Sequence, residues 1–194
     1  MHESIFIAMV FILIYIYLFS NNKNFKYIEA SNGEHFTVYS DTPENEKKKA
    51  NLLALIVDNM YKLKNHLTEN AKDFTEYAEY IKQLNENFNE SRTQILETDF
   101  NSDLTSFSVN KGEEVSFCLK SKKTKEIHDI NLMMYVAIHE MSHFACPEIG
   151  HGDLFQKIFK KFVEEAIKIN IYIKVNFGEI PVEYCGMILS SSIV

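Results

Sequence analysis

Two histidines separated by three residues stand at the end of an apolar stretch, and this pair restricts the possible folds more than any other feature. The apolar stretch covers residues 132–138, and the motif His-Glu-Met-Ser-His follows directly at residues 139–143. The pattern predicts a buried helix over residues 129–145, which Pro147 ends. Residues four apart lie on the same face of a helix. The chain therefore has to bury this helix while both imidazoles share one open face.

The motif has the residue types of a catalytic zinc site. His139 and His143 are the predicted metal ligands, because neutral imidazole is a good zinc ligand and both rings can reach one ion. Glu140 follows the first histidine and can act as the general base instead of binding the metal. Zinc lowers the pKa of a bound water to about 7, so this carboxylate can accept a proton during attack on a carbonyl. The chemistry that the motif indicates is hydrolysis of a peptide bond.

A catalytic zinc site needs a third protein ligand and an open fourth position. We expect His151 to be the third ligand, because residues 147–150 form a short loop that can turn the chain back towards the metal. Glu148 and Asp153 are the alternatives, since carboxylate oxygen also binds zinc. Cys146 offers a thiolate as a further candidate, although a buried free cysteine is the favoured interpretation because the histidines already suffice.

The start of the chain contains a separate signal. Residues 5–19 are apolar or aromatic without exception, close to the lower limit of about 17 residues for crossing a bilayer. No Lys or Arg precedes this segment, which argues against a cleavable signal peptide. Lys23 and Lys26 follow it, and the positive-inside rule then places the rest of the chain in the cytoplasm. We therefore predict a single-pass membrane protein with a transmembrane anchor at residues 1–22 and one domain at residues 23–194.

Charge and cysteine content limit the partners and the compartment. The formal net charge is −7 and the lysine-rich stretches have acidic residues nearby, so no strong nucleic-acid binding is expected. The three cysteines are Cys118, Cys146 and Cys185, an odd number without CxxC spacing. This pattern argues against a disulfide framework and favours a reducing compartment. The expected partners are a protein or peptide substrate and, through the anchor, a membrane.

The first part of the domain predicts two strands followed by two helices. Residues 26–30 and 35–40 flank turn-forming residues and have the pattern of strands. Thr42 is a predicted N-cap with a proline next to it, and the apolar positions beyond it recur every three or four residues. A second helix with the same kind of stripe covers residues 74–88. Stripes of this kind are typical of core packing.

A hairpin is expected before the motif helix, and a further helix after it. Residues 105–109 and 114–119 alternate apolar and polar side chains around a turn at residues 110–113. Apolar positions within residues 154–166 predict another amphipathic helix. The order of helices, strands and helices favours an α+β fold over a doubly wound sheet. With 194 residues, of which 46% are apolar, the chain can bury one core of this kind.

The motif and the residues after it resemble a known family. Residues 136–143, Val-Ala-Ile-His-Glu-Met-Ser-His, and residues 151–155, His-Gly-Asp-Leu-Phe, are similar to the WLM and SprT-like branch of the zincin metallopeptidases. Within that branch, the chain looks like the small membrane-anchored versions from large DNA viruses. The resemblance implies a compact zincin-like metallopeptidase domain, in which a small sheet packs on the HExxH helix.

The same resemblance assigns roles to individual residues. It implies Glu140 as the catalytic base and three zinc ligands, His139, His143 and His151. It also implies that residues 114–119 form the edge strand along which an extended substrate pairs. Tyr184 lies in a further segment like the family's and could polarise a substrate carbonyl, although packing is the favoured role on the sequence alone.

Two functions from different classes are compatible with these features. The first is a membrane-anchored zinc-dependent metallopeptidase, an endopeptidase that uses a glutamate base. The alternative is a catalytically inactive, zinc-stabilised protein-binding module. Glu140 favours the enzyme, because a structural zinc site has no need of a base beside its ligands and fills its fourth position with protein. A zinc hydrolase that acts on a bond other than the peptide bond also fits the motif.

Overall fold

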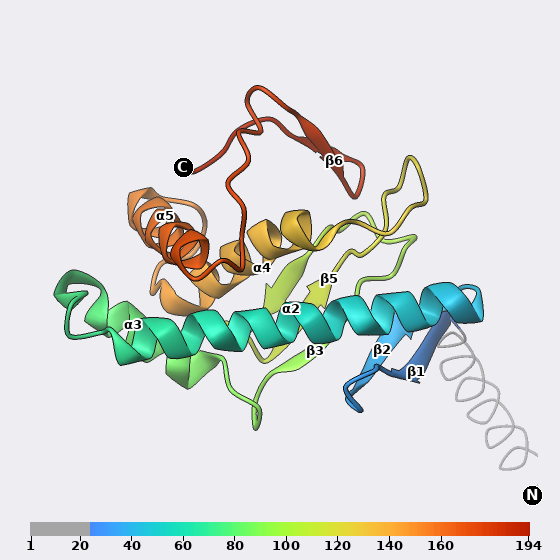
Figure 1. Cartoon of the computed structure of the whole chain (residues 1–194), viewed down its shortest axis with the longest axis horizontal. Coiled ribbons are helices and arrows are strands. Elements are labelled where there is room, and N and C mark those ends of the chain that lie inside the picture. Colours follow the sequence, from blue (N-terminus) through green and yellow to red (C-terminus); the bar gives the residue numbers. More distant parts are fainter. Residues whose placement is uncertain (1–23) are drawn as a thin grey trace, which may run out of the picture.

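The computed structural model describes residues 24–194, which form an α+β domain with helices packed against a five-stranded mixed sheet (Figure 1). The α+β class predicted from the sequence is confirmed. In chain order the elements are β1 (Phe25–Glu29), β2 (His35–Tyr39), α2 (Pro43–Glu69), η2 (Thr75–Tyr77), α3 (Ala78–Asn87), β3 (Gln94–Glu97), β4 (Phe107–Val109), β5 (Glu114–Phe117), α4 (Ile130–Ala145), α5 (Asp153–Lys168), β6 (Val182–Tyr184) and β7 (Met187–Leu189).

The sheet has the strand order β1-β2-β3-β5-β4. β2, β3 and β5 run parallel to one another, whereas β1 and β4 pair antiparallel with their neighbours at the two edges. The expectation that residues 114–119 form the edge strand is wrong, because β5 lies between β3 and β4. The free edge at this end of the sheet belongs to β4, in which Ser108 pairs with Val115 of β5.

The long helix α2 begins at a capped end and covers the core. Oγ1 of Thr42 accepts a hydrogen bond from the backbone N–H of Asn45 at 3.3 Å, and a proline occupies the first turn, as the sequence predicted. The side chains on its inner face, such as Leu53, Ile56 and Met60, are completely buried. They belong to the core that α2 shares with β2 and α4.

A buried ion pair joins α2 to the sheet. Nζ of Lys49 on α2 lies 2.8 Å from Oε2 of Glu97 at the end of β3, and both side chains are almost inaccessible to solvent. The same ammonium group donates to the carbonyl oxygen of Tyr39, whose backbone N–H donates to the Glu97 carboxylate at 2.6 Å. Burial raises the pKa of Glu97 to about 6, even with Lys49 beside it. The sequence analysis did not predict β3, because a charged residue, Glu97, stands at a buried position where a strand pattern has an apolar one.

The structure corrects the predicted localisation, a single-pass membrane protein with a cytoplasmic domain. Among residues 24–194, no helix is both long enough and apolar enough to cross a bilayer. α2 has 27 residues but carries many charged side chains. α4 is apolar but has only 16 residues, a rise of about 24 Å against roughly 30 Å of hydrocarbon. The predicted anchor at residues 1–22 lies outside the described residues.

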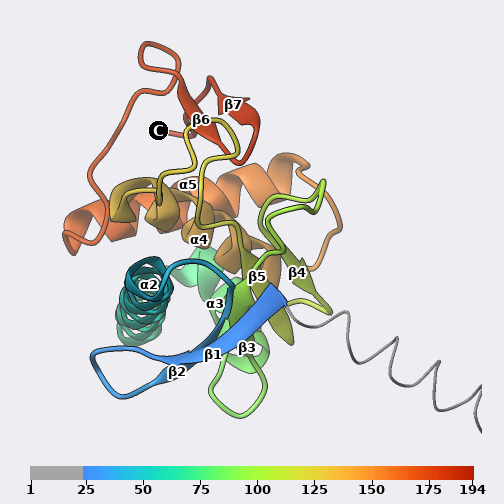
Figure 2. The same ribbon diagram turned by 90° about the vertical axis from the view of Figure 1, so that its right-hand side faces the viewer.

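The C-terminal part of the chain adds a second, two-stranded sheet that the sequence analysis did not predict. β6 and β7 pair antiparallel, and this hairpin lies on the opposite side of α4 from α2 (Figures 1 and 2). After β7 the tail returns to α4, where the N–H of Ile193 donates to the hydroxyl of Tyr135 at 3.2 Å. The motif helix is therefore enclosed by α2, α5 and the hairpin, with β4 near its polar face.

Candidate active site

The motif helix α4 is fixed at its start and buried over most of its surface. Asp129 caps it, because Oδ1 accepts hydrogen bonds from the backbone N–H groups of Asn131 at 2.9 Å and Leu132 at 3.1 Å. Inside the core, the hydroxyl of Ser142 donates to the carbonyl oxygen of Ile138 at 2.7 Å, so this buried polar group has a partner. The remaining polar residues of the motif line an open cleft.

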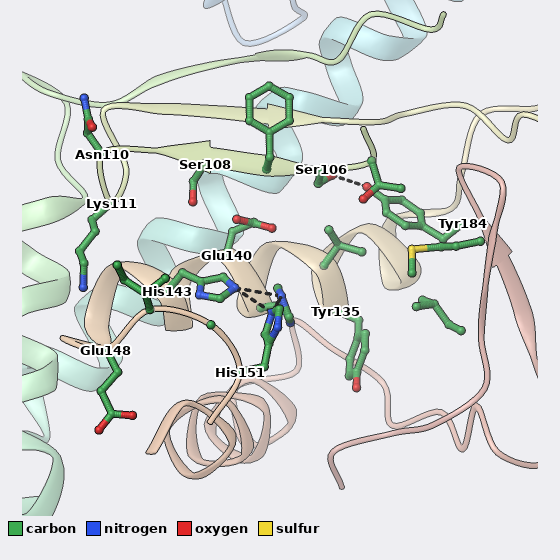
Figure 3. Close-up of a pocket in the computed structure, with 18 residues that line it drawn as sticks. Ser106, Ser108, Asn110, Lys111, Tyr135, Glu140, His143, Glu148, His151 and Tyr184 are labelled. Carbon is green, nitrogen blue, oxygen red and sulfur yellow. Dashed lines mark hydrogen bonds between the residues drawn. The ribbon is translucent and has the colours of Figure 1, made fainter. Parts of the chain in front are cut away.

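The structure brings His139, His143 and His151 together at one point (Figure 3). The Nε2 atoms lie 3.2 Å apart between His139 and His143, 3.1 Å between His143 and His151, and 3.0 Å between His139 and His151. Hydrogen bonds cannot satisfy all three contacts, because each ring nitrogen is either a donor or an acceptor and two of the three must be alike. One shared cation satisfies every lone pair. Tetrahedral zinc with bonds of about 2.0–2.1 Å separates its nitrogens by roughly 3.3 Å, close to this spacing.

The alternative ligands lie outside this group. Among the described residues, the set of metal-binding side chains whose ligand atoms lie within 4.8 Å of one another consists of the three histidines. The carboxylate of Glu148 points away from them (Figure 3). Asp153 belongs to the first turn of α5, and Cys146 is a buried free cysteine. The donor set present is therefore three imidazoles, which fits zinc with a fourth position open.

The protein environment keeps the imidazoles of His139 and His143 neutral. Burial, together with the neighbouring rings of His143 and His151, lowers the pKa of His139 to about 3. Burial, with His151 and Lys111 nearby, lowers the pKa of His143 to about 4. Both rings are therefore unprotonated at neutral pH, which is the form that binds a metal ion.

Phe155, in the first turn of α5, supports all three imidazoles. Its ring centroid lies 4.9 Å from that of His139, 4.3 Å from that of His143 and 4.8 Å from that of His151. Because Phe155 is itself buried, it restricts how the three rings can turn.

Lys111, in the turn between β4 and β5, fixes the start of the loop that carries the third histidine. Its Nζ donates to the carbonyl oxygens of Cys146 at 2.5 Å and Pro147 at 2.9 Å, where α4 ends. The next residue, Gly112, has a φ of +106°, and a Cβ there would lie 2.8 Å from a backbone carbonyl oxygen. Sequence reasoning identified the turn but missed this role, since nothing local in the sequence indicates contact with the end of α4.

Glu140 lies beside the histidines with only 5% of its surface exposed, and its carboxylate points towards Ser108 of the edge strand β4 (Figure 3). Burial raises the pKa of Glu140 to about 7, and a hydrogen bond from the Ser108 hydroxyl offsets part of that rise. A carboxyl group with a pKa near neutrality can both accept and release a proton. Sequence reasoning missed Ser108, which reaches this position through strand pairing.

The site opens into a cleft of about 700 Å³. It is lined by β4 and the turn after it, by one side of α4, by the loop before α5 and by the hairpin β6–β7. One end of the cleft, the metal end, holds the three histidines and Glu140. The other end, the apolar end, is formed by Tyr135, Val136, Tyr184, Met187 and Leu189. A polar reaction centre thus continues directly into an apolar surface.

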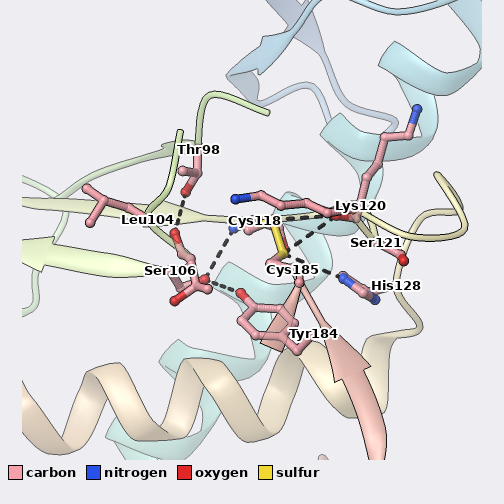
Figure 4. Close-up of a disulfide and its surroundings, with 12 residues drawn as sticks. Thr98, Leu104, Ser106, Cys118, Lys120, Ser121, His128, Tyr184 and Cys185 are labelled. Carbon is pink, nitrogen blue, oxygen red and sulfur yellow. Dashed lines mark hydrogen bonds between the residues drawn. A yellow bond between two sulfur atoms is a disulfide. The ribbon is translucent and has the colours of Figure 1, made fainter. Parts of the chain in front are cut away.

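A disulfide bond joins the hairpin to the main sheet (Figure 4). It links Cys118, just after β5, to Cys185 in the hairpin turn, across a sequence separation of 67. The sequence analysis expected no disulfide, and this expectation is wrong. The odd number of cysteines misled it, because one pair forms and Cys146 remains free. The inference of a reducing compartment, which rested on unpaired cysteines, loses its basis.

Tyr184 packs between the disulfide and the cleft. Only 2% of its surface is exposed, its hydroxyl forms a hydrogen bond with Oγ of Ser106, and its ring lies 5.2 Å from that of His128 (Figure 4). Burial also raises the pKa of its hydroxyl above the ordinary value. These contacts favour the packing role over direct polarisation of a substrate carbonyl.

Comparisons with known proteins give relatives without an assigned activity. No family model matches the chain. The uncharacterized protein R325 of Acanthamoeba polyphaga mimivirus is 40% identical over 150 residues, which cover 77% of this chain and 75% of R325. The uncharacterized protein 136R of Invertebrate iridescent virus 6 is 36% identical over 69 residues, 34% of this chain and 38% of that protein.

Among solved structures, the crystal structure of Wss1 from Saccharomyces cerevisiae is similar to 69% of this chain and 87% of its own chain, with a TM-score of 0.44 and 17% sequence identity. A likeness of this degree does not bear on the activity of the present chain. The function therefore has to be argued from the residues of the site.

Proposed function

The chain belongs to the same family as the mimivirus protein R325, and we propose that it is a zinc-dependent metallopeptidase of the zincin type. The observation that carries the proposal is the convergence of three Nε2 atoms within 3.2 Å of one another, with the buried carboxylate of Glu140 beside them. Three imidazoles and a non-ligating glutamate in an open cleft are the donor set of a catalytic zinc site and not of a closed structural one.

The chain's own residues divide the chemical work between them. His139, His143 and His151 would hold the ion, and zinc bound there supplies a Lewis acid that lowers the pKa of water to about 7. Glu140 accepts a proton at its carboxylate and later returns it to the leaving amine. Ser108 faces this carboxylate and partly offsets the rise of its pKa. The roles are those of general acid–base hydrolysis.

The edge strand β4 offers a way to bind an extended peptide. Among the described strands it pairs on one side only, with β5, and Phe107 and Ser108 line the cleft. An extended segment can add to such an edge through backbone hydrogen bonds, which bind peptides of many sequences. A peptide held along β4 would run past Glu140 and the three histidines, because all of these residues line the same cleft.

The test of this proposal is Glu140→Gln, which keeps the size of the side chain but cannot accept a proton. Zinc content and thermal midpoint are expected to match the parent protein, whereas turnover on a broad peptide library falls about 10²- to 10⁴-fold. Zinc is measured by atomic absorption and cleavage by mass spectrometry. Glu126→Gln, at an exposed loop position before α4, is the control and should keep full turnover.

Each outcome of this experiment decides between functions. Equal cleavage by the parent protein and Glu140→Gln would contradict the mechanism. Cleavage by neither protein, with zinc bound at one ion per chain, would contradict the peptidase and favour the zinc-stabilised binding module.

A further inference from the structure

The hairpin β6–β7 presents an apolar face to the cleft. In its register Tyr184 pairs with Met187, and Glu183 pairs with Ile188. Side chains alternate between the two faces of a strand, and paired residues share a face. Tyr184, Met187 and Leu189 therefore lie on the face that lines the cleft, whereas Glu183 and Ile188 lie on the opposite face.

Helix α4 continues this apolar face towards the reaction centre. Tyr135 and Val136 precede His139 and Glu140 by four residues, so they lie one turn away on the same side of the helix. One helical turn rises about 5.4 Å, and two residues of an extended peptide span roughly 6.6 Å. When the cleavable bond of a peptide lies at the three histidines, a side chain about two positions away from that bond can therefore reach the apolar end of the cleft.

The apolar end is held in place before any substrate binds. The disulfide between Cys118 and Cys185 ties the hairpin to the end of β5 (Figure 4). Tyr184, the residue before Cys185, forms a hydrogen bond through its hydroxyl with Ser106, which directly precedes the edge strand β4. Because little conformational freedom is left to lose on binding, such a surface can discriminate between side chains.

The apolar end offers burial but no counter-charge. None of its five lining residues is charged, and Met187, with 47% of its surface exposed, is the most open side chain on the cleft face of the hairpin. A charged substrate side chain would lose its water there without gaining a partner. A large apolar side chain would instead remove apolar surface of its own and of Met187 from water.

We propose that the cleft face of the β6–β7 hairpin selects peptide substrates with a large apolar side chain within two positions of the cleaved bond. This inference rests on the proposed peptidase function and names the substrate class of the same site. Met187 is its central specificity residue, because its side chain stands open to the cleft while Tyr184 is buried behind it.

The test compares two adjacent positions of β7 that occupy opposite faces. Met187→Lys puts a positive charge at the apolar end, and Ile188→Lys puts the same charge on the other face, where the parent side chain is similarly exposed, 49% against 47%. The zinc-loaded full chain is given capped peptides in which the two positions on each side of the cleavable bond are varied among Leu, Phe, Lys and Glu. Cleavage of each peptide gives kcat and KM separately.

The parent protein and Ile188→Lys are expected to favour Leu or Phe over either charged residue by about 10- to 200-fold in kcat/KM at one of these positions. Met187→Lys should lose this preference and favour Glu there, with most of the change in KM. A gain of cleavage for one peptide class cannot come from general damage to the fold. Cleavage without an apolar preference, or the same preference in both variants, would overturn the proposal and leave the peptidase function intact.

A second readout separates this proposal from the peptidase itself. The same peptides, labelled with a fluorophore, are titrated with zinc-loaded Glu140→Gln protein that carries either lysine substitution or neither, and binding is followed by anisotropy. The proposal is supported, even if no peptide is cleaved, if Leu and Phe peptides bind more tightly than the charged peptides. This preference should disappear in Met187→Lys and remain in Ile188→Lys. Binding without regard to these side chains overturns the proposal.

Discussion

The metal end and the apolar end of the cleft are built in different ways. The metal end takes its ligands from residues 139–151, which belong to one helix and the loop after it. The apolar end combines α4 with the hairpin β6–β7, which a disulfide holds across a sequence separation of 67. The metal end is determined by the spacing of residues close together in the sequence, whereas the apolar end is determined by contacts between distant segments. The two ends should therefore respond to different perturbations, metal loss at one and reduction at the other.

Loss of a ligand is the perturbation with the largest expected effect, and it should act on the metal end. His143→Ala leaves two imidazoles, so the zinc content of the purified protein should fall from about one ion per chain to near zero and peptide cleavage should disappear. The thermal midpoint should fall as well, because metal-binding free energy is partly folding free energy. Zinc is measured by atomic absorption, and the disulfide is checked by thiol titration under denaturing conditions.

Two comparisons make this result specific. His35→Ala, at a half-exposed position of β2 outside the cleft, should keep its zinc. The disulfide should still form in His143→Ala, since Cys118 and Cys185 are not part of the histidine cluster and lie behind Tyr184, at the apolar end of the cleft. A full complement of zinc in His143→Ala would show that the histidine cluster is not the metal site.

Removal of the disulfide is the next largest change, and it should act on the apolar end. In Cys118→Ala/Cys185→Ala, loss of the cross-link should lower the free energy of unfolding by about 4 kcal/mol, from the loop-closure entropy of a loop of this length. Zinc content should stay near that of the parent protein, while the preference for apolar peptides weakens. Denaturant titration measures the stability, and the peptide panel measures the preference.

Cys146→Ala is the matched control, because it removes a buried thiol without removing a cross-link. It should lower stability much less than the double variant does. Loss of zinc from the double variant would show that the two ends are coupled and do not respond to perturbation independently.

The metal end was largely predictable from the sequence because its signals are local. The spacing of His139 and His143, the break at Pro147 and the return at His151 all lie within a short stretch of chain, and α4 and α5 form where the apolar periodicity predicts them. The cap at Thr42 was recognised for the same reason, since it depends only on the residues beside it.

The rest of the cleft depends on contacts between distant segments, which spacing does not reveal. β3 ends in Glu97, a buried acid that is tolerated only because Lys49 reaches it from α2. The family resemblance placed the sheet edge at residues 114–119, although the edge strand is β4, and Ser108 of β4 was not recognised as a partner of Glu140. The pairing of Cys118 with Cys185 depends on the hairpin position, which no local pattern predicts.

Acid should provide the smallest of the three perturbations, and it should act on the scaffold behind the metal end. Glu165 lies on α5, the helix that supports the imidazoles, and it is almost fully buried. His66 of α2 contacts it at 2.9 Å, Lys161 at 2.8 Å and Lys168 at 2.7 Å. Burial alone would raise the pKa of Glu165, but the hydrogen bonds from these partners outweigh it and lower the pKa to about 2.

The change to make is Glu165→Gln, studied without metal so that protonation of the ligands does not contribute. Because the folded-state pKa lies below the value of 4.5 expected for the unfolded chain, the carboxylate stabilises the fold fully above pH 4.5, and this stabilisation is lost as the pH falls towards 2. In this window the parent protein should lose on the order of 1 to 2 kcal/mol of unfolding free energy, and Glu165→Gln should not show this loss. The figure is modest because the side chain of Lys168 reaches solvent, which screens its interaction with Glu165. Urea titrations at several pH values measure the difference, and Glu126→Gln should follow the parent protein. Equal pH slopes in the parent protein and Glu165→Gln would show that the contacts of the Glu165 carboxylate are not what makes the fold sensitive to acid.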